Sequence, residues 1–178
     1  MKIINTNFKG LKIIKQKNNK DSRGNLRETH NGKIVDFTDF VFEYCTTSKK
    51  NVLRGFHFQS KFKQAKYVSV LKGKILDCVV DLRKKSKTFG KSFKIILSDK
   101  NCISLYIPEG FAHAYYSYEN FNIIYYKLSN YYKPKYENGI IWNDKDLKVK
   151  WPFKKPKISP KDKKLPTFEK FLKESKYL

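Results

Sequence analysis

The chain has 178 residues, a length that suits one domain whose core needs neither disulfide bonds nor structural metals. Its 39 lysines and arginines against 16 aspartates and glutamates give a formal net charge of +23, a balance often found in nucleic-acid-binding proteins. Arginine, which suits the reading of bases and phosphates, occurs only at positions 23, 27, 54 and 83. We therefore expect no nucleic-acid partner and interpret the lysines as solvated surface that attracts anionic small substrates.

Neither a signal peptide nor a membrane span is expected from the sequence. Residues 1–14 mix lysine and asparagine with isoleucine, and no uninterrupted apolar stretch follows. Cys45, Cys78 and Cys102 are odd in number, widely spaced and without a CxxC pair. These features predict a cytoplasmic protein with three structural thiols.

Short strands separated by turns are expected through the middle of the chain. Residues 67–71 lead through Lys72-Gly73 into residues 75–82, a pattern typical of a β-hairpin. Turns rich in glycine, aspartate and asparagine separate further strands over 93–97, 104–107, 114–118 and 122–128. This spacing favours an all-β sandwich or barrel.

The C-terminal stretch, 152–178, is predicted to be an extended arm along the surface. It carries four prolines among lysines, and a short helix is expected to close it. Thr167 can cap this helix, and Phe168, Phe171 and Leu172 would share one face.

The segment 53–59 contains the first group of chemically notable residues. Alternation along a strand puts His57 and Gln59 on one face and Phe56 and Phe58 on the other. From this segment alone, His57 is equally well interpreted as a residue that faces a ligand or as a hydrogen-bonded structural histidine.

Lys66 alternates in phase with Val68 and Val70, so it is expected inside the barrel. Buried lysine is uncommon unless it is paired or functional. The alternative is a lysine at the barrel mouth with its ammonium group in water.

A second group covers residues 107–113 and 122–128. Tyr126 shares a face with Ile124 and Leu128, which places a phenol among apolar side chains, where a core tyrosine is the plainer interpretation. No glycine-rich phosphate loop, GxSxG or HExxH motif occurs. No histidine forms a close pair with another histidine and a carboxylate, so we predict neither a catalytic metal nor a cofactor.

Many short segments, in order and over most of the chain, resemble the dTDP-4-dehydrorhamnose 3,5-epimerase family, which belongs to the cupins. They are residues 21–24, 28, 51–59, 64–66, 81–84, 88–90, 107–113, 130–132, 137, 142–144, 151–152 and 159–162. The resemblance implies a single all-β domain over 1–178, a cupin-type jelly-roll barrel with a short C-terminal helical arm.

The resemblance also implies a mechanism. His57 would remove a proton beside the C4 ketone of a nucleotide-linked sugar, with Asp162 fixing its tautomer and stabilising the imidazolium. Lys66 would stabilise the negative charge that develops on the ketone oxygen, and Tyr126 would deliver a proton to the opposite sugar face.

Further residues would bind the substrate by the same analogy. Those expected to grip the sugar and diphosphate are Arg23, Glu28, Arg54, His113, Glu137 and Lys161; ordinary salt bridges at the barrel rim are the alternative. The family further suggests a homodimer in which strands within residues 1–50 pair with the neighbouring subunit. Arg23 and Glu28 would then serve the partner's site.

The nucleotide end departs from the family pattern. Phe42-Glu43-Tyr44 stands where the family usually has Gln-x-Asn, and Asn19 and Asn25 replace aromatic residues. Phe42 and Tyr44 are expected to meet the nucleotide, and we hypothesise that the nucleotide or sugar differs from dTDP-4-keto-6-deoxyglucose.

Two alternatives remain open at this point. A related cupin enzyme could epimerise C3 alone, or act as a ketoisomerase, on a dTDP-, GDP- or other nucleotide 4-keto sugar. A non-catalytic cupin that holds an anionic ligand is the alternative from a different class.

Overall fold

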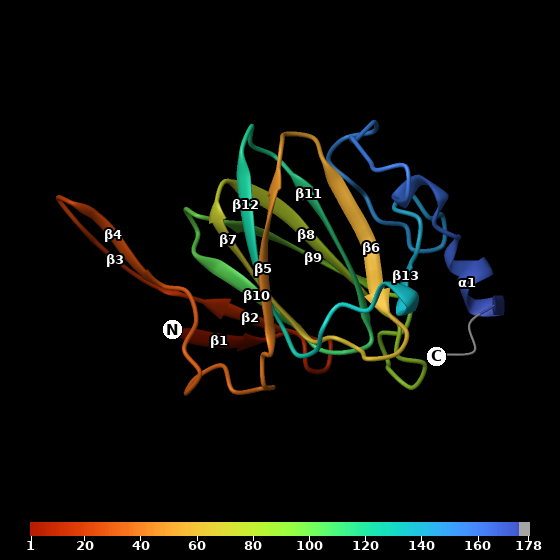
Figure 1. Cartoon of the computed structure of the whole chain (residues 1–178), viewed down its shortest axis with the longest axis horizontal. Coiled ribbons are helices and arrows are strands. Elements are labelled where there is room, and N and C mark those ends of the chain that lie inside the picture. The colour runs from red at the N-terminus through yellow and green to blue at the C-terminus, as the bar shows by residue number, and fades with distance from the viewer. Residues whose placement is uncertain (175–178) are drawn as a thin grey trace.

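The computed structural model describes residues 1–174, in which two antiparallel β-sheets face each other and a short helix lies at the C-terminal end (Figure 1). The six-stranded sheet has the order β1 (Lys2–Asn5), β2 (Lys12–Lys15), β10 (Ile103–Ile107), β7 (Lys66–Lys72), β12 (Asn122–Leu128), β5 (Phe42–Ser48). The five-stranded sheet has the order β13 (Glu137–Gly139), β6 (Leu53–Gln59), β11 (Phe111–Ser117), β8 (Lys74–Asp81), β9 (Ser92–Ser98).

A two-stranded hairpin and three short helical segments complete the described chain. The hairpin pairs β3 (Lys17–Asp21) with β4 (Gly24–Glu28), and Figure 1 shows it standing away from the two sheets. Two turns of 3₁₀ helix, η1 (Pro134–Tyr136) and η2 (Asp162–Lys164), precede α1 (Phe168–Glu174). This arrangement is the predicted all-β jelly roll with a short helical arm.

The main hydrophobic core lies between the two sheets because inward positions alternate along each strand. Val68 and Val70 of β7 pack there with Ile75 and Val79 of β8, and all four are buried. The predicted strands of residues 67–128 are thus present in the expected order.

The hairpin predicted from residues 67–71 and 75–82 is wrong. β7 pairs with β10 and β12, whereas β8 pairs with β9 and β11, so the two strands belong to opposite sheets. Gly73, at a φ of +88°, turns the chain across the barrel end rather than back along the same sheet. A turn between two alternating strands has the same residue pattern in both cases, since both strands must present one apolar face to the core.

The C-terminal arm covers the outer face of the five-stranded sheet. Phe168 and Phe171 of α1 pack in a second core with Phe56, which belongs to β6. The Thr167 hydroxyl accepts a hydrogen bond from the Lys170 amide at 3.2 Å, as predicted for the cap. Leu172, expected on the same face as Phe168 and Phe171, is 36% exposed, whereas both phenylalanines are buried. Residues 175–178 of the predicted arm lie outside the described part of the chain.

The N-terminal strands divide into two groups. β1 and β2 extend the chain's own six-stranded sheet through β10, and β5 closes its other edge against β12. β1 and β5 are the two edge strands of this sheet, so pairing of the N-terminal strands, the projecting β3–β4 hairpin included, with a second subunit stays a prediction.

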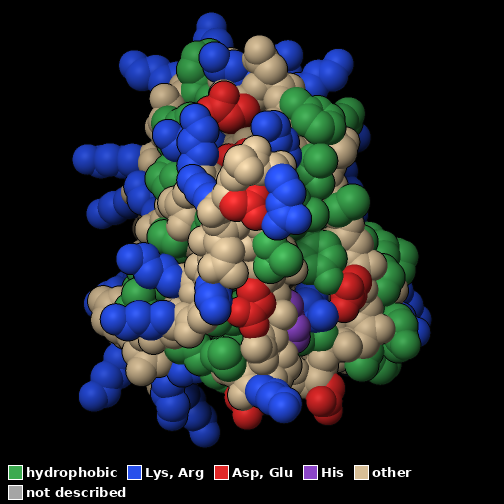
Figure 2. Space-filling view, turned by 90° about the vertical axis from the view of Figure 1, so that its left-hand side faces the viewer, with side chains coloured by type: hydrophobic (Ala, Val, Ile, Leu, Met, Phe, Trp, Pro, Cys, Tyr) green, Lys and Arg blue, Asp and Glu red, His purple; other side chains and the backbone are tan. Residues whose placement is uncertain are grey.

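Lysine and arginine side chains project from the left side and from the upper and lower ends of the face seen in Figure 2, with scattered acidic side chains between them and hydrophobic side chains along the right side. This distribution agrees with the interpretation of the charge as solvated surface. Cys45, Cys78 and Cys102 are all free thiols; Cys78 and Cys102 are buried, whereas Cys45 is exposed. Within residues 1–174, no helix is long and apolar enough to cross a membrane.

Candidate active site

A cavity of about 300 Å³ lies between the two sheets and gathers most of the predicted site residues. Those that line it are His57, Asp162, Lys66, Tyr126, Arg54, His113, Lys161 and Tyr44. They come from strands of both sheets and from the turn η2, so the site exists only once the barrel has closed.

His57 lies on β6 and is held by Asp162. Its Nε2 atom is 2.9 Å from Asp162 Oδ1, while Oδ2 of the same carboxylate accepts a hydrogen bond from the Gly55 amide at 3.1 Å. Burial opposes ionisation of Asp162, but the hydrogen bond to His57 and that from the Gly55 amide outweigh it and lower its pKa. An ionised Asp162 can only accept a hydrogen bond, so Nε2 of His57 is the donor and the lone pair of the neutral imidazole resides on Nδ1.

Gly55 is required for this packing. Its φ is +112°, and a Cβ atom there would lie 2.4 Å from the carbonyl oxygen of His113 on β11. Any side chain would push β6 away from β11 and displace His57 from its register position opposite His113.

Lys66 begins β7 and is buried, as its phase in the strand predicted. Within residues 1–174 its ammonium group makes no hydrogen bond or salt bridge, so it is available to an atom in the cavity. Burial lowers the pKa of Lys66 to about 8, although the charges of Glu137 and Asp77 act in the opposite direction. Most of this lysine is therefore protonated at pH 7.

Tyr126 lies on β12, on the sheet opposite His57. It is 4% exposed and stacks on Tyr44, with ring centroids 4.9 Å apart. Burial, together with the neighbouring Tyr115 and Tyr44, raises the pKa of Tyr126 well above its ordinary value. This phenol keeps its proton until a strong base forms nearby, which is the property of a general acid.

His113 has a carboxylate partner that the sequence interpretation missed. Its Nε2 atom is 2.8 Å from Asp77 Oδ2, and the two side chains are 6% and 0% exposed. Asp77 is in phase with Ile75 and Val79 on β8, which both point into the core. A carboxylate at an inward position of an apolar strand was the signal that could have identified it.

Cations and hydroxyls complete the rim of the cavity. Arg54 donates to Ser48 Oγ and to the Thr47 carbonyl oxygen, both at 3.2 Å, which fixes its guanidinium group at the cavity edge. Lys161 forms an ion pair with Glu137, and this places Glu137 beside the cavity. These contacts leave donor capacity for an anion at this edge.

Besides Glu137, which lies beside the cavity, three predicted residues do not line it. Phe42 packs against Tyr44, which lines the cavity, and the centroids of the two rings are 5.6 Å apart. Arg23 and Glu28 belong to the projecting hairpin, where Arg23 pairs with Asp21 at 2.7 Å and Glu28 accepts from Asn31. Their service to a partner's site stays a prediction.

In residues 1–174, no three or more histidine, cysteine, aspartate or glutamate side chains are grouped so that they could hold a metal ion. Around the cavity lie a histidine, a buried phenol and an ammonium group. That set suits proton transfer at carbon beside a carbonyl.

Comparison with known proteins also indicates an epimerase. The family model described as dTDP-4-dehydrorhamnose 3,5-epimerase matches residues 5–170. An enzyme of that name from Salmonella typhimurium is 37% identical over 179 residues, covering 97% of this chain and 98% of the relative.

Solved structures agree with the fold. A dTDP-6-deoxy-D-glucose-3,5-epimerase from Legionella pneumophila, in complex with dTDP-4-keto-L-rhamnose, has a TM-score of 0.90 and 38% identity over 93% of this chain and 92% of its own. A 3'-monoepimerase from Streptomyces bikiniensis, in complex with dTDP-quinovose, has a TM-score of 0.89 and 26% identity over 94% of this chain and 88% of its own. This chain belongs to the dTDP-4-dehydrorhamnose 3,5-epimerase family, whose members are isomerases acting on carbohydrates.

Proposed function

We propose that this protein epimerises C3 and C5 of a nucleotide-linked 4-keto-6-deoxy sugar, converting a dTDP-4-keto-6-deoxyglucose type of substrate to the 4-keto-rhamnose type. The observation that carries the proposal is the placement of His57 and Tyr126 on facing sheets across one cavity, which Lys66 also lines from β7, the strand next to β12. Inversion at carbon needs a proton removed from one face and another delivered to the opposite face.

The reaction follows from these positions. Nδ1 of His57 takes the proton from the carbon beside the ketone, and the C–H electrons form the enolate double bond while the carbonyl electrons move to oxygen. Lys66 stabilises that oxyanion in a site of low dielectric constant. Tyr126 then protonates the carbon from the other face, and exchange with water restores the phenol and the free imidazole. One bound ketone serves both C3 and C5.

The remaining site residues bind the rest of the substrate in this proposal. Arg54, Lys161 and His113 hold the sugar and diphosphate, with Glu137 orienting Lys161. Phe42 and Tyr44 meet the nucleotide, and Arg23 and Glu28 reach the site of a second copy in a homodimer. A cytoplasmic location remains a prediction.

Proton exchange tests the function directly. The purified protein is incubated with dTDP-4-keto-6-deoxyglucose in deuterated water, and the C3 and C5 protons are followed by NMR. Both signals are expected to disappear as the configuration inverts, and neither should change with His57→Asn. Exchange at C3 alone would replace this proposal by the monoepimerase function, which the similarity to the Streptomyces enzyme favours as second candidate.

Tyr126→Phe separates the two proton transfers. His57 can still remove a proton and return deuterium to the same face, so exchange is expected to continue while inversion stops. Inversion at an undiminished rate would remove Tyr126 from the mechanism.

The same assay with the GDP-linked 4-keto sugar tests the altered nucleotide end. A strong preference for the dTDP-linked sugar would contradict the hypothesis of a changed nucleotide.

A further inference from the structure

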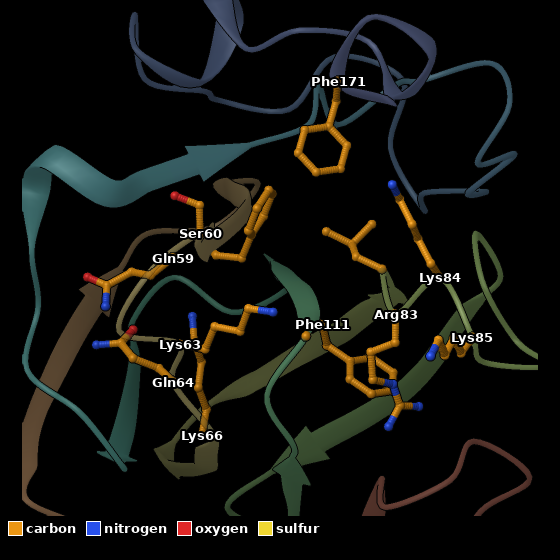
Figure 3. Close-up of a pocket in the computed structure, with 13 residues that line it drawn as sticks. Gln59, Ser60, Lys63, Gln64, Lys66, Arg83, Lys84, Lys85, Phe111 and Phe171 are labelled. Atoms are coloured by element: carbon orange, nitrogen blue, oxygen red, sulfur yellow. The ribbon is translucent and has the colours of Figure 1, made fainter. Parts of the chain in front are cut away.

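A second cavity, of about 350 Å³, opens at the end of the barrel where β6 and β8 finish (Figure 3). Its apolar wall includes Phe58, whose ring packs against Phe171 of α1 with centroids 5.2 Å apart, and Phe111, which lies across the space from Phe171 in Figure 3. Such a wall can bury the rings of an organic ligand, because small-molecule sites combine apolar surface with a few placed polar groups.

The polar side of this cavity is cationic. Lys63, Lys84 and Lys85 line it, are exposed, and make no hydrogen bond or salt bridge to any residue that the structure describes. Arg83 differs, since Asp81 holds it through contacts of 2.7 and 2.9 Å and balances its charge. No acidic side chain of the described residues lines the cavity. The three lysines therefore offer uncompensated positive charge beside apolar surface.

Lys66 connects this cavity to the candidate active site. It lines both cavities, is 8% exposed, and has no hydrogen-bond partner among the described residues. Figure 3 shows Lys63 and Lys66 on the same side of the cavity, across from Phe171. An anion held by Lys63 would thus have a second ammonium group within the same space.

We propose that this second cavity binds a small organic anion, an apolar or aromatic body that carries a carboxylate, sulfonate or phosphate group, and that its occupancy slows catalysis by engaging Lys66. The apolar wall selects the body, and the unpaired lysines select the charge. The catalytic consequence rests on the proposed role of Lys66 in holding the ketone oxygen, whereas the binding itself does not.

Binding is tested with 8-anilinonaphthalene-1-sulfonate, an aromatic sulfonate whose fluorescence rises in apolar surroundings. We expect saturable binding at one site that excess dTDP does not displace. Lys84→Glu combined with Lys85→Glu should weaken binding roughly tenfold at low salt, because two attractive charges become repulsive. The matched control, Lys87→Glu with Lys91→Glu, changes the charge equally outside the cavity and should leave affinity unchanged.

Three outcomes would overturn the site: no saturable binding, displacement by dTDP, or equal weakening by the control pair. Phe171→Ser supplies an independent variant, since it removes the apolar wall without changing charge, and it should also weaken binding. Circular dichroism of each variant establishes that the barrel is folded.

Coupling to catalysis is measured separately. Saturating anilinonaphthalenesulfonate should lower kcat of the wild-type enzyme, and Lys84→Glu with Lys85→Glu should restore it at the same probe concentration. Unchanged turnover at saturation would overturn the coupling to Lys66. If the protein turned over no 4-keto sugar at all, the proposed function would fail while the fluorescence result still decided the site.

Discussion

Two histidines that line the same cavity are each paired with an aspartate, yet the two pairs are held in different surroundings. The His57 side chain is 29% exposed and takes its partner, Asp162, from a turn of the C-terminal arm. The other pair, His113 with Asp77, lies within the β11–β8 ladder and is almost fully buried. A base must exchange its proton with water between turnovers, which the first pair can do and the second cannot readily do. The same two residue types thus suit proton transfer in one place and rigid positioning in the other.

The largest effect that separates the pairs is expected from Asp162→Asn. An amide can hold His57 in the wrong tautomer and cannot stabilise the imidazolium, so kcat should fall roughly 10²- to 10³-fold, within the range of general-base contributions. Steady-state kinetics with the 4-keto sugar measures this, and KM should change little. If Asp77→Asn lowered kcat as much as Asp162→Asn, the distinction between the pairs would be lost.

A smaller effect, on stability rather than turnover, is expected from Asp77→Asn. In this variant the buried His113 ring has an amide in place of a carboxylate as its hydrogen-bond partner. The weaker partner should cost about 1–3 kcal/mol in the free energy of unfolding. Urea denaturation followed by circular dichroism measures it. Asp162→Asn is the control, and an equally large loss in that variant would mean that both pairs are structural.

The smallest effect concerns pH. Lys66 must carry its proton to stabilise the enolate, so kcat/KM should decline as pH rises through about 8, the pKa to which burial lowers this lysine. Asp77 raises that pKa by its negative charge, so Asp77→Asn should move the alkaline decline to lower pH. A pH profile that stays fixed in this variant would show that the buried pair does not act on Lys66.

Strand periodicity predicted the local features well. Alternation placed Lys66 and Tyr126 on inward faces, and these positions depend only on neighbouring residues in one strand. Which strands pair with each other was harder to predict, as the wrong hairpin at Lys72-Gly73 demonstrates. A turn within one sheet and a crossing between two sheets have the same residue pattern.

Contacts over long sequence separations could not be derived from periodicity at all. Asp162 reaches His57 because the C-terminal arm runs back along β6, where Val52 bridges to Lys157 and the Leu53 amide donates to the Lys157 carbonyl oxygen. That return path was expected only through the family resemblance. Alternation along its strand could have predicted that Asp77 points inward. A single carboxylate in an apolar strand does not, however, show which residue it pairs with.

The crossing of the chain between sheets also bears on how quickly the barrel can assemble. From β5 to β12 every connection except β8 to β9 passes from one sheet to the other, so most ladders join strands that are distant in sequence. Long loops must close before these ladders gain any hydrogen bonds, and proteins of this kind fold in milliseconds to seconds rather than microseconds. His57 and Tyr126 cannot meet across the cavity until that slow closure is complete, so recovery of activity after denaturation is limited by topology.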